Sequence, residues 1–158
     1  MTRAGLEWRS TRDGDDSVYK AMDIARYILH RCTQKGRPIE NLKLQKVLYF
    51  VWARFYKQTG KDLFEDRFLA WRYGPVIWDV YYQYRNNVAS PIEVSDGFEL
   101  TEDEDIIRDA VDHYCSRYVG ELINRTHAAG TPWSQAYVHG RGTEISFDSI
   151  RKYCDEHR

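Results

Sequence analysis

The most constraining feature of this sequence is a patterned segment, residues 42–76, which reads LKLQKVLYFVWARFYKQTGKDLFEDRFLAWRYGPV. Its first half has apolar residues at the spacing i, i+3, i+4, i+7, i+8 and i+11, the stripe of an amphipathic helix. These residues are Leu44, Val47, Leu48, Val51, Trp52 and Phe55. Three further aromatic residues widen this stripe until the second half of the helix is apolar almost all round: Tyr49, Phe50 and Tyr56. We therefore predict a helix at the centre of the core, which begins with Asn41 as its N-cap and ends at Gly60.

Shorter patterns follow this helix. Residues 68–73 alternate with period 2 and predict a strand. Pro75 fits the first position of a helix, so a helix is expected over residues 76–88. Two short alternating runs, 92–94 and 98–100, flank Asp96-Gly97, which is typical of a hairpin. We expect these runs and residues 68–73 to form one small antiparallel sheet.

Length and pattern together predict the fold class. A chain of 158 residues fits a single domain with a substantial core. We predict an α+β fold that is predominantly helical, with about six to seven helices around the central helix and a small antiparallel sheet. Residues 1–16 are polar and rich in glycine and aspartate, so we expect a flexible N-terminal extension before one globular domain over 17–158.

Composition limits the partners. The 23 basic residues balance 24 acidic ones, which argues against non-specific nucleic-acid binding as the main role. The sequence contains no run of about 18 apolar residues and no recognisable signal peptide, so we expect no membrane partner and a cytoplasmic location. Three widely spaced cysteines, Cys32, Cys115 and Cys154, predict reduced thiols and not a disulfide framework.

Motifs for metal binding and catalysis are weak. The pairs His30-x-Cys32 and His113-x-Cys115 lie in predicted helices, where residues two apart point about 200° from each other. Cys154-x-x-His157 has no second pair to complete a zinc site. GxSxG, HExxH and Walker motifs are absent from the sequence. We expect no metal, no cofactor and no enzyme activity; a surface cleft that unites a histidine, a cysteine and an acid would favour an enzyme instead.

Four basic residues fall roughly on one face of the central helix. They are Lys43, Lys46, Arg54 and Lys57. This face is either the solvated side of the helix or a contact face for an acidic or nucleic-acid partner.

A second candidate surface follows on the next helix. Trp78, Tyr82 and Arg85 are spaced i, i+4 and i+7 and lie off the apolar stripe. Trp, Tyr and Arg are enriched among the residues that dominate binding at interfaces. The three residues either contact a partner or pack against the N-terminal extension.

Three segments of the chain read LKLQKVLYF, LAWRYGPV and DVYYQYR. Taken together, they resemble the Panacea antitoxin domain family of bacterial and prophage toxin–antitoxin pairs. Residues 60–64, 122–127 and 132–133 extend the resemblance, which spans about residues 20–155. The matching positions expected to define the fold are Leu44, Leu48, Trp71, Tyr73, Gly74, Pro75 and Trp133. The family often has proline where this chain has Trp78, which makes Trp78 a candidate for a partner-specific contact.

The resemblance implies an antitoxin that neutralises a cognate toxin by direct protein contact. Occlusion of the toxin is the mechanism we infer, and delivery of the toxin to a protease is the variant found among relatives. A homo-oligomer stays open. The alternative function is a nucleic-acid-binding regulator that uses the four basic residues of the central helix, although the extension before Ser17 is too short for a separate DNA-binding domain.

Overall fold

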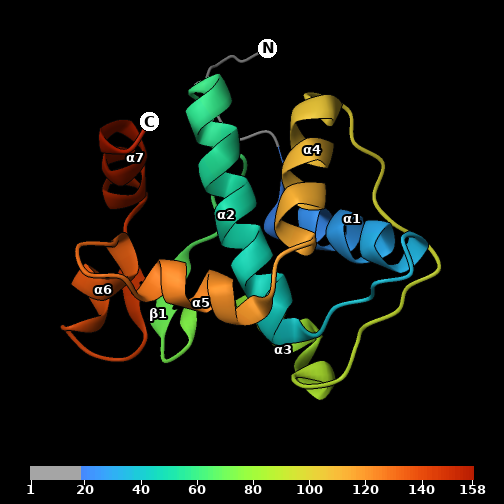
Figure 1. Cartoon of the computed structure of the whole chain (residues 1–158), viewed down its shortest axis with the longest axis horizontal. Helices are drawn as coiled ribbons and strands as arrows, with labels where there is room; N and C mark the ends of the chain where they lie inside the picture. Colours follow the sequence, from blue (N-terminus) through green and yellow to red (C-terminus); the bar gives the residue numbers. More distant parts are fainter. Residues whose placement is uncertain (1–18) are drawn as a thin grey trace, which may run out of the picture.

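The computed structural model describes residues 19–158, so the predicted extension over residues 1–16 lies outside the described part. Seven α-helices and a three-stranded sheet make up that part (Figure 1). In chain order the elements are α1 (Ala21–Gln34), α2 (Asn41–Thr59), β1 (Phe68–Trp71), β2 (Gly74–Val76), α3 (Trp78–Gln83), the 3-10 helix η1 (Arg85–Asn87), α4 (Glu104–Cys115), α5 (Val119–His127), α6 (Pro132–Tyr137), β3 (Thr143–Ile145) and α7 (Phe147–Glu156). The predicted α+β, predominantly helical class is confirmed.

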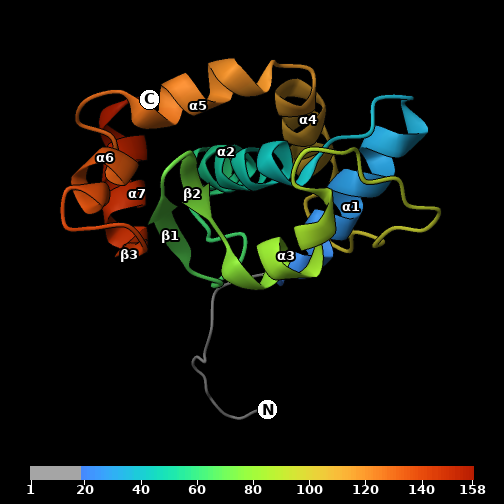
Figure 2. The same ribbon diagram turned by 90° about the horizontal axis from the view of Figure 1, so that it is seen from below.

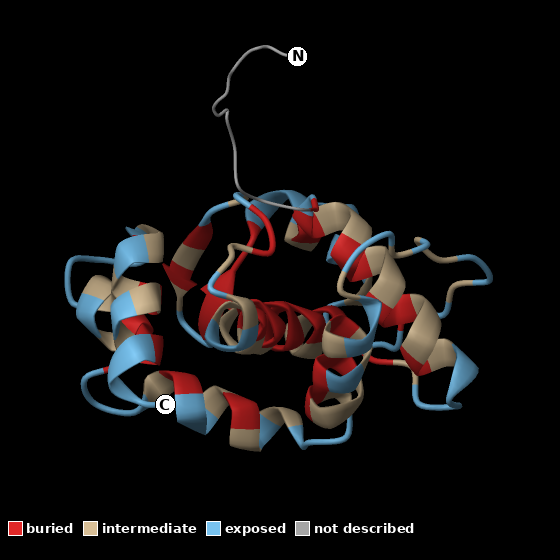
Figure 3. Ribbon diagram, turned by 90° about the horizontal axis from the view of Figure 1, so that it is seen from above, coloured by how far each residue is buried: buried red, intermediate tan, exposed pale blue. Residues whose placement is uncertain are grey.

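Helix α2 is the central helix, as its apolar pattern predicts. Its middle is buried all round, with α1, α3, α4, α5, α7 and β2 packed against it (Figures 1 and 3). Leu44 and Leu48 are fully buried, as expected of fold-defining residues. Trp52 is also fully buried, and its Nε1 donates to the carbonyl of Phe64 at 3.0 Å. Burial of so many large side chains makes α2 the element on which the rest of the chain is assembled.

The sheet is antiparallel with the order β2-β1-β3, and it lies beside α2 (Figure 2). Ala70 pairs with Pro75 of β2 and with Thr143 of β3. The strand predicted over residues 68–73 begins at Phe68 as expected but ends at Trp71, and the hairpin predicted over residues 92–100 is wrong. Those residues form no strand. Gly97 lies against the ring of His30 on α1, and Ile92 bridges Ile39 in the connection between α1 and α2.

The turn between β1 and α3 also differs from the prediction. Pro75 lies inside β2, an edge strand in which its missing N–H costs no ladder hydrogen bond, and helix α3 begins only at Trp78. Asn41 is the first residue of α2 and not its N-cap, which is Glu40. Its Nδ2 instead donates to the carbonyls of Tyr81 and Tyr84, at 3.0 and 3.1 Å. These bonds satisfy carbonyls at the end of α3, which explains why the predicted helix over 76–88 is so short.

Gly74 provides a test of how tightly β2 covers α2. Its φ is 124°, and a Cβ added there would lie 2.7 Å from Cε of Lys46 and 3.1 Å from Oγ1 of Thr126. We expect Gly74→Ala to lower the free energy of unfolding by about 2 kcal/mol or more, because backbone strain and overlap add. Gly60→Ala is the matched control, since Gly60 also has a positive φ, 74°, but open space around it. Its expected cost is about 1 kcal/mol, and equal costs in urea denaturation would contradict the close contact.

Candidate partner-binding site

Exposed aromatic rings cluster on α3 and the neighbouring β1–β2 turn. Trp78 is 45% exposed, Tyr82 51% and Tyr73 50%. The ring of Trp78 lies 5.5 Å from that of half-buried Trp71, 6.0 Å from Tyr81 and 5.9 Å from Tyr82. We call these five residues the aromatic surface. Rings that are packed together yet open to solvent are the kind of side chain that anchors protein interfaces.

Local structure explains why these rings face solvent. Val80 is buried and anchors one side of the short helix α3, and the amide of Ile77 donates to Oε1 of Gln45 at 3.0 Å. The opposite side, with Trp78 and Tyr82, therefore faces outward. Helix α3 lies next to the sheet in Figure 2.

Arg85 completes this group. Its guanidinium lies 4.0 Å from the centroid of the Tyr82 ring and donates to the carbonyl of Tyr82 at 2.8 Å. The structure thus brings Trp78, Tyr82 and Arg85 together on one surface, as their spacing predicts. Their role in binding stays a prediction, and the alternative partner, the N-terminal extension, lies outside the described residues.

The predicted basic face of α2 does not exist as one surface. Lys43 donates from Nζ to the carbonyl of Cys115, the last residue of α4, at 2.7 Å. Arg54 lies 5.1 Å from the ring of Tyr114, and Lys57 is exposed near the end of α7. Lys46, which we predicted on the same face, is fully buried. Strand β2 covers this part of α2, and Gly74 lies directly on the Lys46 side chain.

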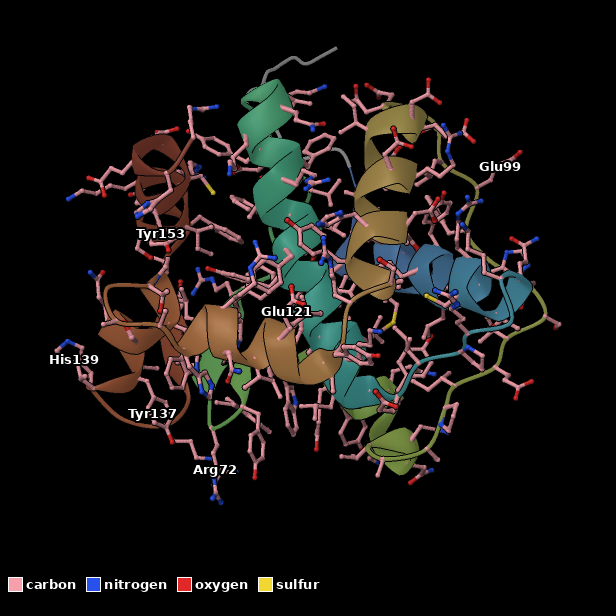
Figure 4. The ribbon with its side chains drawn as sticks, viewed as in Figure 1. Arg72, Glu99, Glu121, Tyr137, His139 and Tyr153 are labelled. Atoms are coloured by element: carbon pink, nitrogen blue, oxygen red, sulfur yellow. The ribbon has the colours of Figure 1, made fainter. Side chains whose placement is uncertain are left out.

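A cleft of about 290 Å³ opens beside the aromatic surface, and we call it the Lys46 cleft. It is lined by Leu42, Gln45, Lys46, Trp71, Arg72, Tyr73, Val76, Tyr81, Val88 and Arg141. The amine of Lys46 has no hydrogen-bond partner in the described part of the chain, and burial lowers the pKa of Lys46 to about 7. Arg72 projects from the β1–β2 turn at the edge of the molecule (Figure 4).

The segments that carry the family resemblance converge around this turn. Trp133 is buried, and its Nε1 donates to the carbonyl of Trp71 at 2.7 Å. The ring of His127 stacks on Trp133 with centroids 4.0 Å apart, and its buried Nε2 has no hydrogen-bond partner among residues 19–158. Gly74 and Pro75 are buried as predicted, whereas Tyr73, predicted to define the fold, is half exposed.

Burial and the charge of Lys46 lower the pKa of His127. Sequence reasoning missed both His127 and the burial of Lys46. The one sequence feature that indicated the burial of Lys46 is its position among the apolar residues of a central helix.

A larger cleft of about 500 Å³ lies between α2, α4, α5 and α7. Arg54, Lys57, Arg125 and His157 line it together with aromatic rings. The guanidinium of Arg125 lies 5.1 Å from the ring of Phe50. Two of the four predicted basic residues thus share a cleft, although it is not the predicted face.

The cysteines adopt an arrangement that the sequence did not reveal. The sulfurs of Cys32 and Cys115 lie 2.8 Å apart, although all three cysteines are free thiols. Both line a cleft with Asp112, whose two oxygens accept from Nε and Nη2 of Arg31 at 2.7 and 2.8 Å. Within residues 19–158 this cleft contains no histidine, so it lacks the combination that would favour an enzyme.

The described part of the chain also lacks the features of a metal site and of a membrane span. Over residues 19–158, no group of three or more His, Cys, Asp or Glu side chains could hold a metal ion. None of the helices in this same range has the length and apolar character needed to cross a membrane.

Comparison with known proteins identifies the family. The family model described as "Antitoxin SocA-like, Panacea domain" matches residues 44–134, which run from the first turn of α2 through the β1–β2 turn and α3 to α5 to the start of α6. Antitoxin SocA of Caulobacter vibrioides (strain NA1000 / CB15N) is 29% identical over 156 residues, covering 90% of this chain and 81% of the relative. No solved structure matches significantly. The chain therefore belongs to the SocA-like antitoxin family with a Panacea domain.

Proposed function

We propose that this protein is an antitoxin that neutralises a cognate toxin by direct contact through the aromatic surface and Arg85. Family membership supports the antitoxin role. The observation that carries the choice of surface is the distribution of exposed apolar side chains. Of the six large hydrophobic residues that are exposed within residues 19–158, four surround α3 and the Lys46 cleft: Tyr73, Trp78, Tyr82 and Val88. An apolar patch of this kind on a folded domain marks an interaction site.

Occlusion of the toxin is the mechanism that this surface fits best. The hydrogen bonds of Asn41 and Gln45 to the backbone of α3 fix this short helix against α2. A rigid surface loses little conformational entropy on binding, which favours tight association. A protease-adaptor mechanism would need a second surface for the protease, and the basic cleft around Arg54 and Arg125 is available for it.

Nucleic-acid binding is the rival function. Its support is the cleft that places Arg54, Lys57 and Arg125 beside aromatic rings. Lys43 and Lys46 make no part of that cleft, and the formal net charge is −1. A steep fall in DNA affinity with added salt would support this rival, whereas absence of binding at low salt would remove it.

Co-expression tests the proposed function. The gene is expected to lie beside a toxin gene, and expression of this protein should restore the growth of cells that produce that toxin. The two purified proteins should also form a stable complex, with Kd in the nanomolar range on the order expected for a preformed interface. Failure to rescue growth from any neighbouring toxic gene product would count against the antitoxin role.

A further inference from the structure

The Lys46 cleft has an electrostatic imbalance that the fold does not explain. Three cations, Lys46, Arg72 and Arg141, line it, and no carboxylate of residues 19–158 does. Neither arginine forms an ion pair within that range. The guanidinium of Arg72 lies 5.3 Å from the centroid of the Tyr73 ring, and that of Arg141 lies 5.5 Å from the centroid of the Trp71 ring. A local excess of positive charge over aromatic rings attracts an anionic group.

Lys46 is the most unusual group in the cleft. A lysine is almost never fully buried unless it is paired, because desolvating the ammonium is costly. Lys46 is 0% exposed, and its amine lacks any hydrogen-bond partner in the described structure. Met or Leu would fill the same space without this cost. A group that destabilises the folded protein in this way is typical of a functional site.

The neighbouring groups do not supply the missing partner. His127 faces this region from α5, and its Nε2 also lacks a hydrogen-bond partner in the described part of the chain. Arg72 lies on the β1–β2 turn and Arg141 precedes β3; both are cations. Tyr81 is the residue of α3 that lines the cleft, and its side chain is a phenol and not a carboxylate. The partner that would satisfy Lys46 must therefore come from outside residues 19–158.

We propose that the Lys46 cleft binds a carboxylate, and that its occupant is an acidic side chain of the cognate toxin. The carboxylate enters between Arg72 and Arg141 and forms an ion pair with the ammonium of Lys46. Where the amine is neutral before binding, it takes one proton from solvent as the carboxylate arrives, and no other bond changes. This inference rests on the proposed function, because it names the chemical group by which the toxin is held beside the aromatic surface.

The cleft is suited to this task for two reasons. Its rim shares Trp71, Tyr73 and Tyr81 with the aromatic surface, so one partner can cover both. A charged hydrogen bond made inside a partly desolvated cleft is stronger than one made in water. The aromatic surface would supply area and the Lys46 cleft would supply specificity for a partner with an acid at the matching position.

A small carboxylate tests the cleft without the toxin. Phenylacetate should bind the full-length protein saturably and raise the pKa of Lys46, followed through the ¹³Cε resonance of Lys46 in NMR titrations. Phenylacetamide, its neutral analogue, should bind at least about tenfold more weakly because it cannot form the ion pair. Equal binding of the two probes, or binding of neither, would overturn the carboxylate site while leaving the antitoxin function intact.

The toxin itself tests the occupant. Arg141→Ala should weaken toxin binding by roughly tenfold and Lys46→Met by roughly 30-fold or more. Arg37→Ala and Lys152→Met, which change exposed residues outside the cleft, are the matched controls and should bind normally. One acid-to-amide change on the toxin should weaken binding to the wild-type protein but not to the Lys46→Met variant.

Normal toxin binding by both the Arg141→Ala and Lys46→Met variants would overturn the inference and leave the proposed function standing. Absence of binding by the wild-type protein would instead remove both.

Discussion

Replacing Trp78 by alanine should weaken binding of the cognate toxin by about 2–4 kcal/mol, which is roughly a 30- to 1,000-fold increase in Kd. The reason lies in the position of this ring within the aromatic surface. It is 45% exposed in the free protein and is surrounded by Trp71, Tyr81 and Tyr82. A partner that covers it removes the remaining exposed area from water and adds contacts with a ring that is already held in place. Isothermal titration or surface binding with purified toxin measures the change.

Tyr82→Ala and Arg85→Ala should produce smaller losses of the same sign, since these residues lie beside Trp78 and Arg85 covers the Tyr82 ring. Tyr118→Ala is the matched control. Tyr118 is 86% exposed on the N-terminal side of α5 and is not part of the aromatic surface. All four variants alter exposed side chains and should unfold at temperatures close to that of the wild type. An unchanged Kd for both Trp78→Ala and Tyr82→Ala would show that the toxin binds elsewhere.

Replacing Lys46 by methionine should stabilise the folded protein strongly at pH 6 and only slightly at pH 10. Burial lowers the pKa of Lys46 from 10.5 to about 7. A shift of this size corresponds to a cost on the order of 4–5 kcal/mol to the folded state at pH 7 and below. Methionine has a similar length and no charge, so it removes this cost without opening a large cavity.

The sign of the pH dependence follows from the two pKa values. Between pH 7 and 10.5 the unfolded chain holds a proton on Lys46 that the folded chain does not, so the wild-type protein gains stability from this group as the pH rises. Above 10.5 both states are neutral and the cost disappears. The stabilisation produced by Lys46→Met should therefore fall by several kcal/mol between pH 6 and pH 10.

Chemical denaturation at several pH values measures this difference. The control is Lys152→Met, the same substitution at an exposed position on α7, which should change stability by about 0.5 kcal/mol or less at every pH. A Lys46→Met variant that is less stable than the wild type at pH 6 would contradict the account of an unpaired buried amine. The combination of a more stable fold and weaker toxin binding would identify Lys46 as a residue kept for function.

The periodicity of residues 44–55 was sufficient to predict the centre of the fold, because a helix that is apolar on most sides has few other places to lie. The positions of Trp133 and Gly74 followed from the family resemblance. The sheet was harder to predict. Phe68 pairs with Ile145, far along the chain, and local turn residues such as Asp96-Gly97 carry no information about such a long-range pairing.

The candidate site could also be predicted only in part, because local spacing reveals some of its residues and long-range contacts place the others. Trp78 and Tyr82 lie on α3, and Arg85 begins η1 just after it, so their short spacing along the chain was enough to bring them together. The Lys46 cleft is assembled from α2, the β1–β2 turn, α3 and the segment before β3. Helical spacing placed Lys46 with Lys43 and Arg54, but the tertiary contact with Gly74 decides its environment. Burial by a distant segment overrides the polarity expected from the residue type.

The central claim is that this protein neutralises a toxin by direct contact through the aromatic surface beside α3. The most direct measurement is growth rescue of toxin-producing cells by the wild type, Trp78→Ala and Tyr118→Ala, each at matched protein levels. The account predicts rescue by the wild type and by Tyr118→Ala, and a clear loss of rescue by Trp78→Ala with the fold intact. Equal rescue by all three proteins would contradict the assignment of this surface.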